Sequence, residues 1–263
     1  MEEPGTVYFT GTAGAGKTTF VRAFAEWMRA SGYDATVVNL DPGLEDSSFE
    51  PDVDVREWVR LADIQDEYGL GPNGAQVAAA DMIALKIFDI KQAVTELKTD
   101  YVLVDTPGQI ELFAFREASK AIVDALSGDR STIAFLFDPA LARHPGGFIS
   151  LAMLSATVEF RFRLPMVNLL AKSDVLTPAQ LEEITGWSED RESLYAAVTR
   201  DSPTPDVQLS TELFRAIESM GPLLGLVATS AKEGTGLDAF YQSCQRVFGG
   251  GEDLEPSHAP SNE

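Results

Sequence analysis

The chain has 263 residues, and 44% of them are hydrophobic, which is enough to bury one large α/β core. Lys and Arg number 20 against 41 Asp and Glu, so the formal net charge is −21 at pH 7. A surface of this acidity repels phosphate backbones and anionic lipids, which argues against direct binding of nucleic acids or membranes.

Short apolar runs alternate with helix-like periodic segments along the chain. Val7–Thr10 ends in glycines and precedes a long periodic segment, Lys17–Ala30, so the order there is strand, loop, helix. The same reasoning predicts strands at Ala35–Leu40, Tyr101–Asp105, Thr132–Phe137, Met166–Leu170 and Leu224–Thr229, and helices at Phe148–Phe160 and Leu237–Phe248. This alternation predicts an α/β fold with a mostly or wholly parallel sheet, whose ligands bind outside the carboxyl ends of the strands.

The alternating segments predict a single domain over residues 1–248. Residues 50–80 form an acidic stretch broken by glycines, and residues 178–209 form a second polar stretch with prolines. We expect both to be helical insertions on the sheet. Residues 249–263 combine glycines, prolines and acids with few apolar residues, which predicts a disordered acidic tail.

Several features of the sequence concern its environment. Cys244 is the single cysteine and lies in an apolar-periodic stretch, so we expect a packed thiol in a reducing cytosol. The N-terminus has no signal-peptide pattern, and no stretch is long enough to span a bilayer, so a cytoplasmic location is expected. The excess acids are spread along the chain, which favours adaptation to high salt over an acidic interaction surface, the alternative.

Residues 11–18 match the pattern G-x-x-x-x-G-K-[ST] between a predicted strand and a predicted helix. The glycines let the backbone curl so that N–H groups point at phosphate oxygens, and the helix N-terminus adds partial positive charge. Lys17 is expected to reach the β- and γ-phosphates and the Thr18 hydroxyl to ligate Mg²⁺, whereas a bland glycine-rich turn would need neither. The predicted phosphate-binding residues are Gly11, Thr12, Ala13, Gly14, Ala15, Gly16, Lys17, Thr18 and Thr19.

Two further strands end in aspartates. Asp105 opens the segment D-T-P-G-Q, in which the aspartate can hold Mg²⁺ through water and Gly108 can offer its N–H to the γ-phosphate. Such a loop senses whether the γ-phosphate is present. Asp41 ends an earlier strand, and we expect it in the Mg²⁺ water shell or in activation of the attacking water; a turn or helix cap is the alternative.

Lys172 and Asp174 form a K-x-D pattern after the strand that ends at Leu170. The Asp174 carboxylate can accept hydrogen bonds from N1–H and from the exocyclic amine of guanine, a pair that adenine does not present. The stem of Lys172 is expected to lie along the base plane. A second segment, expected to contact guanine O6 through its backbone, consists of Ser230, Ala231 and Lys232. Guanine is therefore predicted over adenine.

Taken together, the motifs resemble those of the GPN-loop GTPases, in their single archaeal-type form. They occur in the order of that family and span nearly the whole predicted domain. On composition alone, residues 71–73 would be a turn, and only the resemblance assigns them a further role. The resemblance rests on Gly11–Thr19, Asn39-Leu40-Asp41-Pro42, Gly71-Pro72-Asn73-Gly74-Ala75, Asp105-Thr106-Pro107-Gly108-Gln109-Ile110-Glu111 and Ala171-Lys172-Ser173-Asp174.

The resemblance implies a homodimeric, Mg²⁺-dependent GTPase that switches state during the assembly of protein complexes. It implies that the Gly71-Pro72-Asn73 loop of one subunit reaches toward the phosphates in the other, where Asn73 supplies a polar contact. Eukaryotic relatives are linked to RNA polymerase II, so RNA polymerase subunits are a candidate client by analogy only.

The reaction expected from these residues is in-line attack of water on the γ-phosphate. The alternative is a P-loop kinase that transfers phosphate to a small molecule or a nucleic-acid end. The switch is favoured because Asp105–Gln109 has the form of a γ-phosphate sensor and no basic acceptor pocket is evident. The roles expected are charge neutralisation for Lys17, metal placement for Thr18 and Asp105, and arrangement of the water for Asp41, Gln109 and Asn73.

Overall fold

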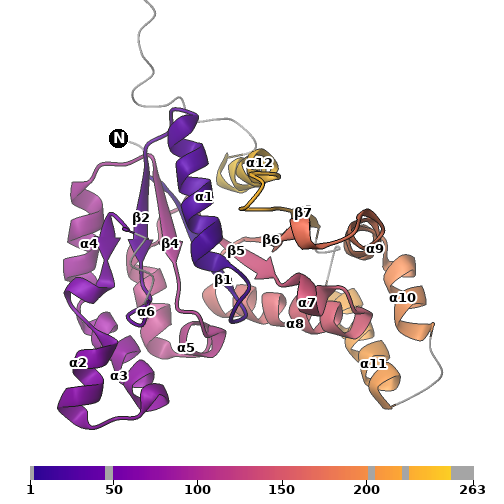
Figure 1. Ribbon diagram of the computed structural model, residues 1–263, viewed down its shortest axis with the longest axis horizontal. Coiled ribbons are helices and arrows are strands. Elements are labelled where there is room, and N and C mark those ends of the chain that lie inside the picture. The colour runs from indigo at the N-terminus through magenta and orange to yellow at the C-terminus, as the bar shows by residue number, and fades with distance from the viewer. Residues whose placement is uncertain (1–2, 45–49, 201–204, 221–224, 250–263) are drawn as a thin grey trace, which may run out of the picture.

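A computed structural model describes residues 3–44, 50–200, 205–220 and 225–249. Within these residues the strands form one seven-stranded sheet in the order β3-β2-β4-β1-β5-β6-β7 (Figure 1). Every neighbouring pair is parallel, so the predicted α/β fold with a parallel sheet is confirmed. The strands are β1 (Gly5–Gly11), β2 (Ala35–Asn39), β3 (Val53–Asp54), β4 (Tyr101–Asp105), β5 (Ser131–Phe137), β6 (Met166–Leu170) and β7 (Leu226–Ala228).

Helices connect the strands and cover both faces of the sheet (Figure 1). Among the described helices, none is both long and apolar enough to cross a lipid bilayer. The helices are α1 (Lys17–Ala30), α2 (Leu61–Tyr68), α3 (Pro72–Leu85), α4 (Ile87–Glu96), α5 (Ile110–Ala114), α6 (Glu117–Leu126), α7 (Pro139–Ala142), α8 (Pro145–Phe162), α9 (Pro178–Glu189), α10 (Arg191–Thr199), α11 (Pro205–Met220) and α12 (Leu237–Gly249). Two 3₁₀ turns occupy Val55–Glu57 and Ser173–Val175.

The central strands contribute side chains to two apolar cores, because successive side chains of a strand point to opposite faces of the sheet. On one face Phe9 packs against α1 and α12, and the ring centroids of Phe24 and Phe240 lie 4.7 Å apart. On the other face Phe135 belongs to a larger core that includes Phe148 of α8. Burial on both faces explains why these strands appear in the sequence as continuous apolar runs rather than alternating patterns.

The segment 50–80 differs from the predicted insertion at both ends. Val53 and Asp54 form β3, which pairs with the end of β2 and makes the edge of the sheet. A two-residue strand in an acidic stretch is too short to give a periodic signal. At the other end, α3 continues to Leu85, and it begins at the segment that composition alone marks as a turn. Pro72 is its first residue, where the missing N–H of proline costs no helical hydrogen bond.

The second predicted insertion is helical, but its boundary at residue 209 is wrong. Helices α9, α10 and α11 follow β6, and α11 continues through Leu209 to Met220. A capping box between Thr177 and Gln180 begins α9. Figure 1 shows α9 beside β7, α10 beyond it and α11 near α8, all at the opposite end of the molecule from α2 and α3.

Two sequence predictions near the C-terminus have different outcomes. Cys244 lies on the core-facing side of α12 and is 2% exposed, and burial raises the pKa of its thiol, so the packed thiol is confirmed. The predicted tail begins at Gly249, which instead ends α12. Residues 250–263 lie outside the described residues.

Candidate nucleotide-binding site

The loop between β1 and α1 has a backbone that glycine alone accommodates well. Gly14 and Gly16 have φ angles of +77° and +94°, in the left-handed region. At Gly11 a side chain would place its Cβ 2.7 Å from the carbonyl oxygen of Leu136, a collision with backbone. Gly16 is the N-cap residue of α1 and has no side chain. No side-chain oxygen at the cap therefore competes with a ligand for the first N–H groups of the helix.

Lys17 links this loop to the segment that follows β4. The side chain is 6% exposed, and its Nζ donates hydrogen bonds to the carbonyl oxygens of Gly11, Thr12 and Gly108, each at 3.0 Å. Burial lowers the pKa of Lys17, and nearby carboxylates oppose that effect. The lysine predicted to contact phosphates therefore lies between the two loops that were predicted to hold them.

Thr18 and Asp105 present oxygen ligands side by side. Thr18 Oγ1 donates to Asp105 Oδ2 at 2.6 Å. The other carboxylate oxygen, Oδ1, is buried and accepts no hydrogen bond from any residue that the structure describes. Burial raises the pKa of Asp105 to about 7, although the Thr18 hydrogen bond lowers it. A buried carboxylate oxygen without a partner is costly, and a pair of hard oxygen donors suits Mg²⁺.

Thr18 and Asp105 offer one hydroxyl and one carboxylate to a metal ion. Across residues 3–44, 50–200, 205–220 and 225–249, no group of three or more His, Cys, Asp or Glu side chains is placed to hold an ion. Mg²⁺ is usually bound through one or two carboxylates, with phosphates and water completing its shell. The residues present therefore fit a magnesium ion that is shared with a nucleotide.

Asp41 holds the segment after β4 through Gly108. Its Oδ2 accepts the Gly108 N–H at 3.1 Å, and its Oδ1 accepts the Gly43 N–H at 2.9 Å. The N–H expected to face the γ-phosphate is thus bonded to a carboxylate in the structure. A phosphate oxygen that takes this donor would have to displace Asp41, so the two acceptors compete for one N–H.

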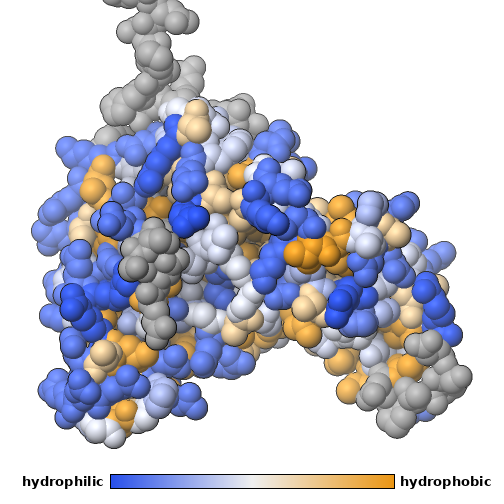
Figure 2. Space-filling model, in the orientation of Figure 1, coloured by the Kyte–Doolittle hydropathy of each residue, from blue (hydrophilic) through white to orange (hydrophobic). Residues whose placement is uncertain are grey.

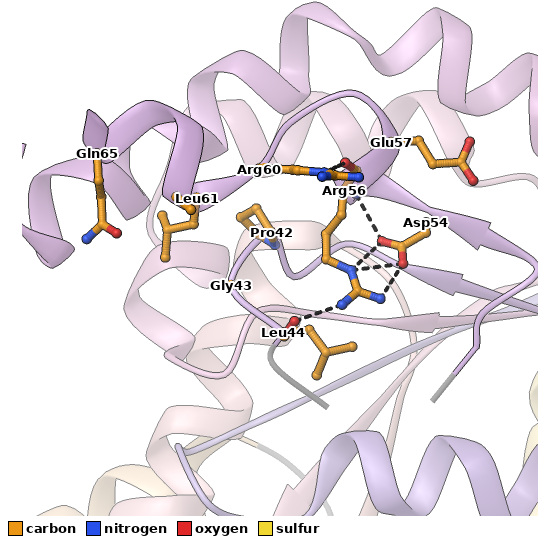
Figure 3. Close-up of a pocket in the computed structure, with 10 residues that line it drawn as sticks. Pro42, Gly43, Leu44, Asp54, Arg56, Glu57, Arg60, Leu61 and Gln65 are labelled. Atoms are coloured by element: carbon orange, nitrogen blue, oxygen red, sulfur yellow. Dashed lines mark hydrogen bonds and ion pairs between the residues drawn. The ribbon is translucent and has the colours of Figure 1, made fainter. Parts of the chain in front are cut away.

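A buried network fixes the position of Asp41. Asn39 is 0% exposed; its Oδ1 accepts the Asp41 N–H at 2.9 Å, and its Nδ2 donates to the Asp41 carbonyl and to Asp54 Oδ1 at 3.1 and 3.0 Å. The Arg56 guanidinium group binds both carboxylate oxygens of Asp54 and donates a hydrogen bond to the carbonyl of Leu44 at 2.8 Å. These residues lie beside a pocket of about 480 Å³ (Figure 3). The short strand β3 thereby contributes to the site, a role that the sequence did not reveal.

We expect Asn39→Ala to lower the free energy of unfolding by about 2–3 kcal/mol, because buried polar groups of Asp41 and Asp54 lose their partners. Urea unfolding measures this change. The rate of the hydrolysis expected from the motifs should fall as well, because Asp41 is no longer held. An unfolding free energy within about 0.5 kcal/mol of the wild-type value would show that the network does not stabilise the site.

The residues predicted to read the base lie together next to the phosphate loop. Lys172 Nζ donates to the carbonyl of Gly14 and lies 3.4 Å from Asp138 Oδ2. Asp174 Oδ1 accepts from Ser230 Oγ at 2.7 Å. The ends of β6 and β7 therefore place a lysine, a carboxylate and a hydroxyl at the mouth of the same loop.

Asp138 is a residue of this site that the sequence motifs do not single out. It directly follows β5, caps the short helix α7 by accepting the Ala140 N–H at 2.8 Å, and has a side chain that is 16% exposed. The signal that could have found it is the one used for Asp41 and Asp105, an aspartate at the carboxyl end of a buried strand. Its carboxylate attracts the ammonium group of Lys172, which also donates to the carbonyl of Gly14.

A cavity of about 210 Å³, here called the switch cavity, lies between the loops and α3. Asp41, Gly108 and Gln109 line it together with Ala13 of the phosphate loop and Gln76 of α3. The structure thus brings these predicted site residues to one place. The predicted site residues that lie exposed are Ala13, Gly14, Thr19, Asn73, Gln109 and Lys232.

Comparisons with known proteins agree with the motifs. A family model described as a conserved hypothetical ATP binding protein matches residues 9–250. A GPN-loop GTPase of Pyrococcus abyssi is 30% identical, covering 88% of this chain and 92% of the relative. One from Arabidopsis thaliana is 32% identical over 89% of this chain, and GPN-loop GTPase 1 of Dictyostelium discoideum is 28% identical over 92%. The chain spans 62% and 61% of the length of these last two relatives.

A solved structure gives the same result for the fold. The crystal structure of the Pyrococcus abyssi GTPase in its apo form matches with a TM-score of 0.84 and 28% identity, covering 93% of this chain and 97% of that one. The description of the family model names ATP, whereas the relatives are named as GTPases. With the family model over nearly all of the chain and relatives at 30% and 32% identity, the chain belongs to the GPN-loop GTPase family.

Proposed function

We propose that the protein binds Mg²⁺·GTP, hydrolyses it to GDP and phosphate, and acts as a molecular switch. The observation that carries this proposal is the position of Gly108. Its N–H is bonded to Asp41 and its carbonyl to Lys17. A γ-phosphate that engages Lys17 and the Gly108 N–H would break both bonds and release the segment after β4. The position of that segment would then depend on the nucleotide, which is the property of a switch.

The metal and the phosphate chain share a small set of residues. Thr18 and Asp105 would hold Mg²⁺, which supplies a positive charge that offsets the charge of the β- and γ-phosphates. Lys17, already buried beside the loop carbonyls, would neutralise charge that develops in the transition state. Asp41 and Gln109, which line the switch cavity, would orient the attacking water.

Base selection is assigned to Asp174. The Ser230 hydroxyl fixes its carboxylate, and an oriented carboxylate can accept from N1–H and the exocyclic amine of guanine at once. The backbone at Ala231 and Lys232 follows in the turn closed by the bridge between Ser230 and Thr235, where it would contact guanine O6. Adenine would leave this carboxylate unpaired, which is costly.

The proposed homodimer has support in the surface around Asn73. Exposed apolar side chains flank this residue: Tyr68, Leu70 and Val77 are 57%, 37% and 38% exposed. Figure 2 shows small apolar areas among hydrophilic surface at the corner where α2 and α3 lie, and clustered exposed apolar side chains often mark interfaces. Asn73 itself is exposed in the first turn of α3, accessible to a second copy of the chain.

Mixing two inactive variants tests the trans role of Asn73. Asn73→Ala lacks the loop amide, and Lys17→Ala lacks a working phosphate loop. If the amide acts across the dimer, each mixed dimer has one complete site, and an equal mixture should recover about a quarter of wild-type hydrolysis. If Asn73 acts within its own subunit, mixing would recover nothing.

Release of free phosphate distinguishes the switch from a kinase. Incubation with Mg²⁺·GTP and no other acceptor should release phosphate, because water is the acceptor in the proposed reaction. No release under these conditions would contradict the proposal.

By family analogy, a Gln109→Ala variant that holds GTP should retain a protein client such as RNA polymerase subunits. If it recovers no such subunits, that client is wrong.

A further inference from the structure

Helix α3 carries a polar side chain where its pattern calls for an apolar one. Ala75, Ala79, Ala80 and Ile83 are buried and form the core-facing stripe of the helix. At 100° per residue, Gln76 falls within this stripe, between Ile83 and Ala80. A glutamine in such a position serves either the packing of the helix or a function.

The hydrogen bonding of Gln76 does not support a purely structural role. Its Oε1 is buried and accepts no hydrogen bond from the part of the chain that the structure describes. Buried polar side chains that stabilise a fold have partners, and an unpaired buried acceptor destabilises it. An apolar side chain of similar size would suit the stripe better. The glutamine therefore costs stability at a position that touches the candidate site.

The place where Gln76 meets the site is the switch cavity. Its side chain lines this cavity together with Asp41, Gly108 and Gln109. A volume of about 210 Å³ is larger than the roughly 30 Å³ that one water occupies in the liquid. The terminal torsion of a glutamine is broad, so the amide can turn its oxygen into the cavity at little cost. A water there would give Oε1 the donor it lacks.

We propose that Gln76 binds the attacking water and accepts a hydrogen bond from it. This inference rests on the proposed GTPase function. The water oxygen forms a bond to the γ-phosphorus while the bond from that phosphorus to the bridging oxygen of GDP breaks. Both protons of the water end on the phosphate product, one on the oxygen that came from the water and one on a γ-phosphate oxygen, and Gln76 keeps all of its own atoms. Gln76 acts on the nucleotide bound to its own subunit. Asn73, one helical turn earlier in α3, is proposed to act on the nucleotide bound to the other subunit.

The variant Gln76→Met removes the amide and keeps the length of the side chain. Single-turnover hydrolysis of saturating Mg²⁺·GTP should slow by about 100-fold, the effect of losing a group that orients a reacting water. The dissociation constant for GTP should stay within about threefold, since the ground-state contacts are unchanged. The melting temperature without nucleotide should be equal to or higher than that of the wild type, because an unpaired buried acceptor is gone. A structural role would lower it instead.

Two more variants complete the test. Gln92→Met, on the exposed part of α4, makes the same chemical change away from the site and should hydrolyse GTP at the wild-type rate. Gln76→Glu keeps an acceptor oxygen and should hydrolyse GTP at least about tenfold faster than Gln76→Met. If both Gln76 variants hydrolyse GTP within threefold of the wild type, the inference is wrong while the proposed function stands. If the wild type itself releases no phosphate, the proposed function fails.

Discussion

Replacement of Lys17 by alanine is expected to slow GTP hydrolysis by about 10²–10³-fold, the usual cost of removing one preorganised donor from a transition state. The ammonium group is buried at the centre of three carbonyl oxygens, from Gly11, Thr12 and Gly108. Phosphate oxygens that enter the loop would exchange these neutral acceptors for charged ones, and hydrogen bonds to charged acceptors are stronger. Single-turnover hydrolysis with excess protein measures the effect.

A matched control is Lys120→Ala on α6, which removes a half-buried lysine paired with Asp124 and should leave hydrolysis unchanged. The Lys17→Ala variant should remain folded, because burial already disfavours the charged form of Lys17. Its melting temperature should therefore stay near the wild-type value, while the rise caused by GTP is lost. Hydrolysis within about threefold of the wild type would rule out a role for Lys17 in the reaction.

Asp174→Asn should change the preferred base from guanine to xanthine. An asparagine amide group donates where the carboxylate accepts, so it repels the exocyclic amine of guanine but pairs with the carbonyl that xanthine carries at the same carbon. We expect GTP affinity to fall by roughly 100-fold or more and XTP to bind better than GTP, since unpaired polar groups in a base site are costly.

Competition against a fluorescent guanine nucleotide measures both affinities. Ser230 can still donate to the remaining oxygen of the side chain, so the loop geometry should persist. Asp63→Asn, on the exposed face of α2, is the control for the loss of one negative charge and should bind GTP like the wild type. Equal affinity of Asp174→Asn for GTP and XTP would show that this side chain does not read the base.

The central strands could be predicted from the sequence because both of their faces are buried, and α1 because its buried residues recur at helical spacing. β4 and β6 begin and end at the predicted residues, and so does α1. A parallel strand covered on both faces appears as an unbroken apolar run with glycine or aspartate after it, a signal that does not depend on distant contacts. β3 lacks this signal because two residues at a sheet edge are held by pairing with β2 and not by their own pattern.

The residues of the site also fall into those that the sequence predicts and those that it does not. The phosphate loop and the aspartates at the carboxyl ends of β2 and β4 can be predicted from motifs that combine residue type with position at a strand end. The partners of those residues do not follow, because Asn39, Asp54 and Arg56 act through a network that only the three-dimensional arrangement assembles. Gln76 has a sequence signal, a polar residue in an apolar helical stripe, but its meaning appears only when the unpaired oxygen and the switch cavity are seen together.

The most direct test of the central claim is calorimetric titration of the protein with GTP and with ATP, each with Mg²⁺ and at high salt. The arrangement of the phosphate loop and Asp174 predicts one GTP bound per chain, with ATP weaker by about 100-fold or more. Failure to bind GTP, or equal affinities for the two nucleotides, would contradict it.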